Sequence, residues 1–269
     1  VYKRQTVLCA ELSDGEIVRG ESLIPERKNR EPIRRIFLEP RGNDSGTAVT
    51  AHRGAVTAIC QADAIIIGPG SLYTSIMPNL AYSEIAEAIC TSTAVKIYIC
   101  NVMSQPGETD NYTVTQHVQS ITNQSGIEID YVLVNDGIAP PQILKNYVQQ
   151  EIIGQLARIN TYTEEGMKFV QQESNQPSSQ STNFVNSMSD FTKHINQLSN
   201  EINRITDSSK VQIFFDPQVD QLDGIEVVTA DMIHNTKVVA HGIELDVVRH
   251  DPRQLAQTLT KVLYSHFNQ

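Results

Sequence analysis

The stretch Ala62-Asp-Ala-Ile-Ile-Ile-Gly-Pro-Gly-Ser-Leu-Tyr-Thr-Ser75 decides the fold of this 269-residue chain. Its apolar run stops abruptly at a turn with two glycines, as buried strands of parallel sheets do. The runs Val95–Cys100 and Tyr131–Val134 repeat the pattern, and each ends in a polar turn. Amphipathic helical segments at Tyr82–Thr91 and Val114–Thr122 separate the three runs. This alternation predicts an α/β fold, with a parallel sheet covered by helices on both faces.

Antiparallel strands are expected ahead of this core. Thr6–Leu12 and Glu16–Gly20 flank an Asp14-Gly15 turn, which predicts a β-hairpin. A further strand is expected at Ile33–Leu38. The basic stretch Glu26–Arg35 is interpreted as a solvated face rather than a phosphate clamp.

The remainder of the chain suggests three regions: an α/β core at 1–150, a helical insertion at 151–209, and a return to the same α/β domain at 210–269. A helix is expected to run from Pro141 to about Gln172, followed by a Ser/Gln-rich linker at Glu173–Asn183. In the last region, strands are expected at Val211–Phe215, Ile225–Thr229 and Lys237–Ala240. A final helix should begin at Asp251-Pro252 and bury Leu255, Leu259, Val262 and Leu263.

Within the predicted insertion, large apolar residues recur at spacings of four and three, the pattern of a coiled-coil seam. They are Phe184, Met188, Phe191, Ile195, Leu198, Ile202 and Ile205. This helix packs either against its own domain or against a second copy of the chain, and the spacing does not distinguish the two. A homo-oligomer through 184–205 is therefore one of two hypotheses.

The charge balance limits the classes of partner. The net charge of −10 and the pI of about 5.1 disfavour nucleic acid, although local donors can still hold a single phosphate. The four cysteines form no C-x-x-C pair and lie in apolar runs, so we expect buried free thiols in a reducing, cytoplasmic compartment. We expect no membrane span and no zinc site. The start at Val1, without a methionine, suggests a piece of a longer protein.

The glycine-rich turn is the strongest local signal for a ligand. Its glycines allow a ligand to approach the backbone, and its amides and hydroxyls can face an anion. It matches neither the P-loop nor the dinucleotide motif, and a plain strand-to-helix turn is the alternative. We expect anion binding because carboxyl ends of parallel strands are where open α/β sheets bind ligands. The candidate residues are Gly68, Pro69, Gly70, Ser71, Tyr73, Thr74 and Ser75.

Two more strand-end turns add candidates at the same predicted edge. They are Asn101, Met103, Gln105, Gly107, Glu108 and Thr109 after the second run, and Asn135, Asp136 and Gly137 after the third. Glu108, Asp110 and Asp136 could hold Mg²⁺, the only cofactor we consider, although a merely solvated loop is an equal alternative for 101–110. Near the last helix, Arg249 could pair with phosphate, Asp251 should cap the helix, and His250 is interpreted as structural.

Read together, Ala62–Leu80, Ile99–Asp110, Val132–Gly137 and Arg249–Pro252 resemble the family of bacterial gluconeogenesis factors and 2-phospho-L-lactate transferases. The resemblance implies a modified Rossmann-like fold and a cytoplasmic protein. One branch transfers phospholactate to a deazaflavin precursor. The other, which this chain resembles more closely, binds UDP-sugars and supports cell shape during gluconeogenic growth. The positions carried over are Gly68, Gly70, Ser71, Thr74, Asn101, Asn135, Asp136 and Arg249.

Two features depart from the family pattern. Members open with a glycine-rich Gly-Gly-Thr/Asn-Gly turn that helps to hold the ligand, and this chain has none. The segment from about Glu151 to Ser209 also looks like an insertion. We therefore expect a nucleotide-sugar-binding regulatory protein, with no assigned catalytic residue. A phospholactate-type transferase that uses Mg²⁺ is the alternative.

Overall fold

The computed structural model describes residues 6–27, 29–41, 49–148, 192, 211–240 and 243–268. The chain divides into two compact units, residues 1–139 with 213–269, and residues 140–212. Of the second unit, residues 141–148 are helical, as predicted for the start of that segment. Apart from Thr192, the predicted insertion and its apolar seam lie outside the described residues.

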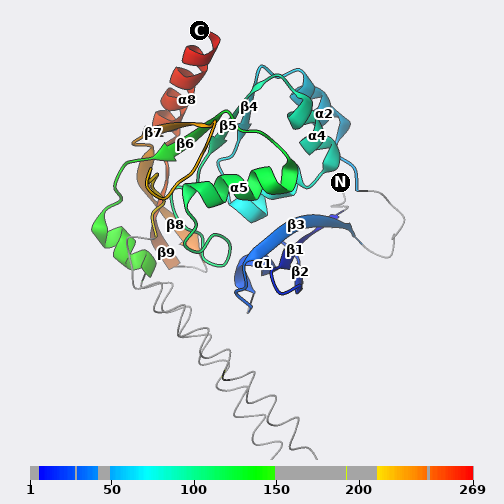
Figure 1. The fold of residues 1–269 in the computed structure, drawn as a ribbon. Helices are drawn as coiled ribbons and strands as arrows, with labels where there is room; N and C mark the ends of the chain where they lie inside the picture. Colours follow the sequence, from blue (N-terminus) through cyan, green and yellow to red (C-terminus); the bar gives the residue numbers. More distant parts are fainter. Residues whose placement is uncertain are drawn as a thin grey trace, which may run out of the picture. The chain divides into compact units, whose positions relative to one another are not determined.

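A four-stranded parallel sheet forms the centre of the first unit (Figure 1). Its strands are β4 (Ala64–Ile67), β5 (Val95–Ile99), β6 (Tyr131–Asn135) and β7 (Glu226–Ala230), in that order. All three neighbouring pairs are parallel. The α/β, Rossmann-like prediction is confirmed, and the predicted strand at Ile225–Thr229 is β7 of this sheet.

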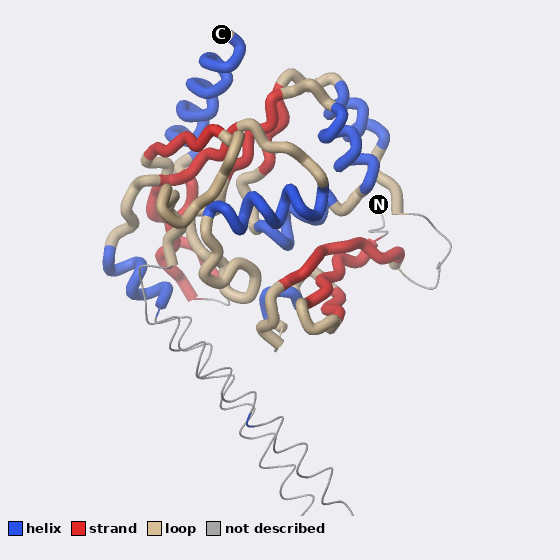
Figure 2. Tube along the Cα trace, in the orientation of Figure 1, coloured by secondary structure: helices blue, strands red, loops and turns tan. Residues whose placement is uncertain are grey.

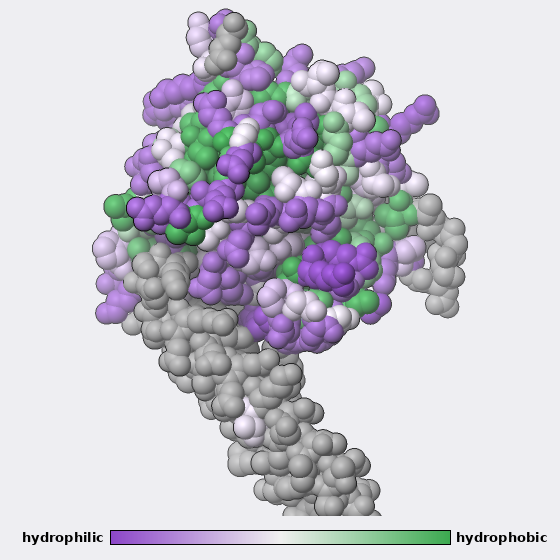
Figure 3. Space-filling model, viewed as in Figure 1, coloured by the Kyte–Doolittle hydropathy of each residue, from purple (hydrophilic) through white to green (hydrophobic). Residues whose placement is uncertain are grey.

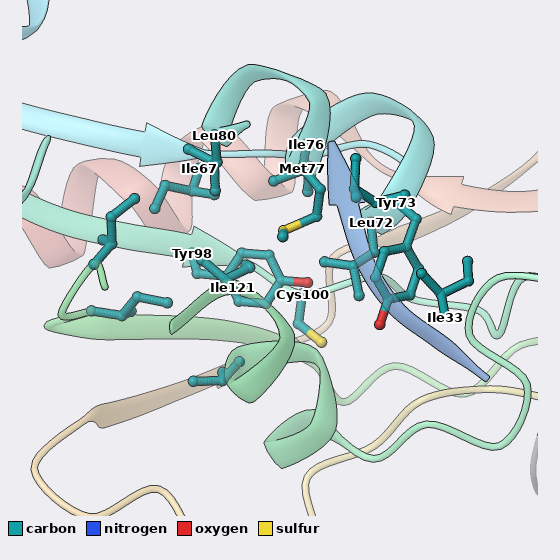
Figure 4. Packing of buried hydrophobic residues seen from close by; sticks show 14 of the residues in the cluster. Ile33, Ile67, Leu72, Tyr73, Ile76, Met77, Leu80, Tyr98, Cys100 and Ile121 are labelled. Atoms are coloured by element: carbon teal, nitrogen blue, oxygen red, sulfur yellow. The ribbon is translucent and has the colours of Figure 1, made fainter. Parts of the chain in front are cut away.

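Alternate side chains of each strand enter two separate cores, because successive residues point to opposite faces. On one face, Ile67 and Tyr98 join Ile121 of α5 (Val114–Ser125) in the larger core (Figure 4). On the other face, Leu133 packs with Leu255 and Val262. Leu255 and Val262 both come from α8 (Pro252–Phe267). The larger core, on the first face, also receives residues from α4 (Ser83–Thr91) and α2 (Arg53–Cys60).

The expected start of α8 is confirmed. The carboxylate of Asp251 accepts hydrogen bonds from the backbone N–H groups of Arg253 and Gln254, at 2.8 and 3.0 Å. These are helix-terminal donors that would otherwise have no partner. Figure 2 shows α8 as one continuous helix ending at the C-terminus.

An antiparallel sheet is formed by the N-terminal strands β1 (Thr6–Leu12), β2 (Ile17–Arg19) and β3 (Ile33–Pro40), in the order β2-β1-β3. The predicted hairpin is therefore confirmed, with α1 (Leu23–Glu26) following it. At the outer edge of β3, the amide of Gln124 accepts from the Ile36 N–H and donates to the Ile36 carbonyl, both at 2.8 Å. Gln124 belongs to α5, so this contact joins the antiparallel sheet to the parallel layer.

One expectation for the last region was wrong, and a second was correct for the strand but not for the sheet that it joins. Residues 211–215 are turn and irregular structure with one isolated bridge, not a strand. Residues 237–240 are a strand, but they belong to β8 (Ile233–Ala240), which pairs with β9 (Ile243–His250) in a separate antiparallel ribbon. β9 was not predicted. Short apolar runs such as 237–240 do not identify their partner, because pairing is set by the whole chain.

The four cysteines are free thiols, as predicted, but their burial was predicted correctly for two of them. Cys9 and Cys100 are buried in strands or at their ends, whereas Cys60 and Cys90 are exposed near the ends of α2 and α4. Apolar neighbours in sequence do not bury a helical residue when its own side chain faces outward. No helix in the described part of the chain is long and apolar enough to cross a membrane.

Candidate binding site at the carboxyl edge of the sheet

Because β4, β5 and β6 are parallel neighbours, the turns that follow them lie along one edge of the sheet, as predicted (Figure 1). The glycine-rich turn follows β4, Asn101 follows β5, and Asp136 and Gly137 follow β6. The three turns lie close together, as predicted, because the strands that they follow are parallel and adjacent in the sheet.

The glycine-rich turn depends on its first glycine. Gly68 has φ +97°, and a Cβ there would lie 3.2 Å from the carbonyl oxygen of Ile99 on the neighbouring strand. After a cis Gly68–Pro69 bond, the Ser71 carbonyl accepts from the N–H groups of Ser75 and Ile76, at 2.9 and 3.0 Å. This starts η1 (Leu72–Ile76), a π-helical turn that continues into α3 (Met77–Leu80).

Glu108 binds the glycine-rich turn from the second loop. Its carboxylate accepts from the Tyr73 N–H at 3.2 Å and from the Thr74 hydroxyl at 2.9 Å. It also accepts from the Gln105 side chain at 2.8 Å, and Glu108 is 3% exposed. Burial raises the pKa of Glu108, and the hydrogen bonds from Thr74 and Tyr73 oppose that shift. Glu108 therefore already occupies part of the turn that we expected to hold a ligand anion.

The rest of the 101–110 loop is also bonded internally. The Thr109 hydroxyl accepts from the Gln105 N–H at 3.0 Å, and Asp110 accepts from the Gly107 N–H at 2.8 Å. Arg27, which is buried, donates to the Gly107 carbonyl. Gly107 has φ +80°, and a Cβ there would overlap Pro25 and a neighbouring guanidinium. Met103 is buried. These contacts make the loop an ordered wall of the site.

The carboxylates suggested for Mg²⁺ have other partners or separate positions. Glu108 bonds to the glycine-rich turn and Asp110 bonds within its own loop, while Asp136 is exposed after β6. Within the described ranges, no group of three or more His, Cys, Asp or Glu side chains is placed to hold a metal ion.

Asn135 is a structural link rather than a free ligand group. Its Nδ2 donates to the Gly137 carbonyl at 2.7 Å, and its Oδ1 accepts from the N–H groups of Gly137 and Met232, at 3.1 and 3.0 Å. It is 1% exposed, and Met232 lies just before β8. Asn135 thus fixes the β8–β9 ribbon to the carboxyl end of β6.

That ribbon brings His250 to the same edge, and Arg249 precedes it in β9. Arg249 is exposed and lies opposite His234 across the ribbon. His250 forms a hydrogen bond with the backbone of Cys100 at the end of β5, and burial lowers the pKa of His250. In the part of the chain that the structure describes, neither His250 Nε2 nor Asn101 Oδ1, both buried, has a hydrogen-bond partner. His250 was predicted to be structural because the sequence shows no partner for it, and the structure places it against the Cys100 backbone.

Comparison with known proteins assigns the chain to a family. Residues 2–175, well over half of the chain, match the family described as 2-phospho-L-lactate transferase CofD. The chain belongs to the CofD family. The gluconeogenesis factor of Bacillus subtilis is 46% identical over 142 residues, which cover 52% of this chain and 42% of that protein. The gluconeogenesis factor of Halalkalibacterium halodurans is 44% identical over 149 residues, covering 55% of this chain and 44% of that protein.

A solved structure supports the CofD-family fold. The crystal structure of a Bacillus halodurans protein superposes with a TM-score of 0.61 at 26% identity, covering 95% of this chain and 58% of that one. This CofD-family chain spans less than half the length of the two gluconeogenesis factors. The activity of the whole protein is therefore a matter for proposal.

Several groups at the edge of this CofD-family chain remain available to a ligand. The N–H groups of Gly70 and Ser71 have no hydrogen-bond acceptor among the described residues. The Ser75 side chain is exposed, as are Asp136 and Arg249. Glu108, Thr109 and Asn135 shape the edge, and these three were predicted as ligand contacts. A sequence does not distinguish a polar loop residue that bonds to another loop from one that contacts a ligand, because both are polar residues in turns.

Proposed function

We propose that this chain carries part of the binding site for a phosphate-bearing nucleotide ligand, specifically a UDP-sugar, at the carboxyl edge of its parallel sheet. The proposal rests chiefly on the free N–H groups of Gly70 and Ser71, next to the exposed hydroxyl of Ser75. Backbone amides and hydroxyls in a turn after a parallel strand are suited to phosphate.

The spacing of the edge supports an extended ligand. Neighbouring strands lie about 4.8 Å apart, so the turns after β4 and β6 are separated by roughly 10 Å. A diphosphate with its attached groups can extend over such a distance. Arg249, which is exposed and precedes His250 in β9, is the positive charge that we assign to this ligand, since a guanidinium can pair with a second phosphate or a polar substituent.

We further propose that the whole protein acts in regulation, as a gluconeogenesis factor that supports cell shape during gluconeogenic growth, rather than as an enzyme. The names of the relatives support the gluconeogenesis-factor part of this role, and the cell-shape part is what the family resemblance implies. Complementing a strain that lacks the gene, grown on a gluconeogenic carbon source, would test it. Wild type should restore normal shape and Arg249→Gln should not, whereas rescue by the variant at equal abundance would contradict the proposal.

Calorimetry on the full-length protein with UDP-sugars tests the binding proposal directly. Arg249→Gln should weaken binding roughly 10- to 100-fold, because it removes a charge-assisted hydrogen bond. Arg253→Gln, a change of the same kind at an exposed position of α8, is the matched control and should leave affinity unchanged. A folded protein that gives no binding heat with any UDP-sugar would reject the proposal.

The family description keeps a second function in view, the transfer of phospholactate to a deazaflavin precursor. Incubation with a deazaflavin acceptor, an activated phospholactate donor and Mg²⁺ should then give product by mass spectrometry. We rank this second because, of the suggested metal ligands, Glu108 already bonds to Thr74 of the glycine-rich turn and Asp110 to the Gly107 N–H in its own loop. The absence of product across several donors would remove this alternative.

A further inference from the structure

A large open groove lies away from the carboxyl edge, between β3, α4 and α5. Its volume is about 940 Å³, which is within the range of small-molecule sites. It shares one residue, Tyr73, with the glycine-rich turn. In Figure 3 the surface over α5 and β3 is mainly hydrophilic, with apolar side chains between the polar ones.

The walls of the groove are rich in neutral polar groups. α5 contributes the amides of Gln116, Gln119 and Asn123 together with the hydroxyl of Ser120. Side-chain amides offer both donors and acceptors from one planar group. Such a wall can bond to ligand groups that both donate and accept, above all to hydroxyls.

The charges of the lining nearly cancel. Arg34 and Arg35 line one side, and both pair with Glu11, at 2.9 and 2.6 Å. Glu87 lines the other side. The lining itself thus carries two positive groups and one negative group, and Glu11, which lies outside the lining, pairs with both arginines, so the groove has little excess charge with which to attract an ion.

The floor combines hydroxyls with apolar surface. The Tyr73 hydroxyl lies 2.9 Å from the Tyr112 hydroxyl and 3.1 Å from Ser120 Oγ. The two tyrosine rings meet edge to face, with centroids 6.2 Å apart. Beside them, Leu80 and Ala86 supply apolar surface. A ligand with C–H faces and hydroxyl edges matches this mixture.

We propose that this groove is a second binding site, specific for a neutral, hydroxyl-rich ligand such as an uncharged sugar or polyol. The amide wall supplies paired donors and acceptors, the balanced charges disfavour anions, and the apolar part of the floor packs against carbon-bound hydrogens. Phosphate-bearing ligands belong at the carboxyl edge instead.

Tyr73 connects the two sites. Its hydroxyl belongs to the floor of the groove, while its backbone N–H donates to Glu108 beside the glycine-rich turn. A ligand that bonds to the Tyr73 hydroxyl therefore changes the position of the glycine-rich turn between Ser71 and Tyr73. This coupling, unlike the groove site itself, rests on the proposed nucleotide function.

Ligand-observed NMR and calorimetry with glucose, maltose and inositol test the groove. We expect saturable binding of at least one of them, weakened roughly tenfold or more by Gln119→Ala or Asn123→Ala. Gln257→Ala, an exposed glutamine of α8 on the other face of the sheet, is the matched control. The proposal would be overturned if none of these probes bound, or if the groove variants and the control variant bound them equally well. Inorganic phosphate and triglycine serve as an anionic and a peptide probe, and a preference for either would also overturn it.

The coupling has its own test in the full-length protein. Tyr73→Phe keeps the ring but removes the bonds to Tyr112 and Ser120, so the sugar should bind without changing the affinity for a UDP-sugar. Ser120→Ala is the milder variant if Tyr73→Phe fails to fold. Sugar binding without any effect on nucleotide affinity in wild type would refute the coupling and leave the groove site standing. Loss of nucleotide binding alone would refute only the proposed function.

Discussion

Among single side chains, His117 should dominate the response of stability to mild acid. Its ring is fully buried, its Nδ1 bonds to the Thr113 carbonyl at 2.8 Å, and burial lowers its pKa from 6.5 to about 4. Between these values the unfolded chain binds a proton that the folded chain does not. The stabilisation is thus complete above pH 6.5 and is lost as the pH falls towards 4, an effect of about 3 kcal/mol.

Urea unfolding of wild type and His117→Gln across that pH range measures this effect. The wild type should lose stability more steeply than the variant as the pH falls. Parallel curves for the two proteins would show that His117 does not control the transition.

Glu108 should act in the opposite direction. Because burial raises its pKa above the ordinary 4.5, the folded chain keeps a proton that the unfolded chain has lost as the pH rises past 4.5. Stability from this group therefore falls with rising pH until the folded carboxyl ionises. Glu108→Gln removes this dependence, and it should also cost about 1–3 kcal/mol because an amide nitrogen replaces one of two accepting oxygens. Denaturation at pH 4.5 and 7 checks both, with Glu87→Gln as an exposed control; a variant as stable as wild type would contradict the assigned role.

At the level of elements, the bond between Gln124 and Ile36 protects the outer edge of β3. An unpaired strand edge invites pairing with another chain, and here one side-chain amide satisfies both backbone groups of Ile36. Gln124→Ala should cost about 1–3 kcal/mol because it leaves those groups without partners. Gln119→Ala, an exposed change on the same helix, should cost much less.

Hydrogen exchange of the Ile36 amide gives a second measurement for this prediction. Protection should fall selectively at Ile36 in Gln124→Ala. Unchanged protection would mean that water or another group replaces the glutamine without loss.

Elements with strong periodicity were predictable from sequence, and elements defined by distant partners were not. The strand at 64–67 and the helix at 83–91 carry their burial pattern locally. β9 and the short α2 were missed because their pairing and packing depend on residues far along the chain. The same holds for the site: Gly68 was recognisable from its turn, whereas the bonds of Glu108 to Tyr73 and of His250 to Cys100 require the folded chain.

For the whole molecule, the predicted apolar seam between Phe184 and Ile205 still suggests self-association. That seam lies outside the described residues, so the prediction stands on its sequence spacing. Replacing Phe191 and Leu198 with Glu should convert a dimer into a folded monomer in light scattering, since buried charges are costly. A native protein that is monomeric at high concentration would show that the seam packs within its own chain.

The late entry of β7 into the sheet has a consequence for the order of folding. The connections from β4 to β5 and from β5 to β6 contain 27 and 31 residues, whereas 90 residues separate β6 from β7. By the scaling of loop-closure entropy with chain length alone, joining strands 90 residues apart costs roughly 1 kcal/mol more than joining strands 31 residues apart. The first three strands should therefore form a nucleus on which β7 docks afterwards, and with it the β8–β9 ribbon that carries Arg249. The carboxyl edge is completed only in this last and slowest step, so a protein synthesised without residues 210–269 should form its first three strands and yet bind a ligand at that edge only weakly.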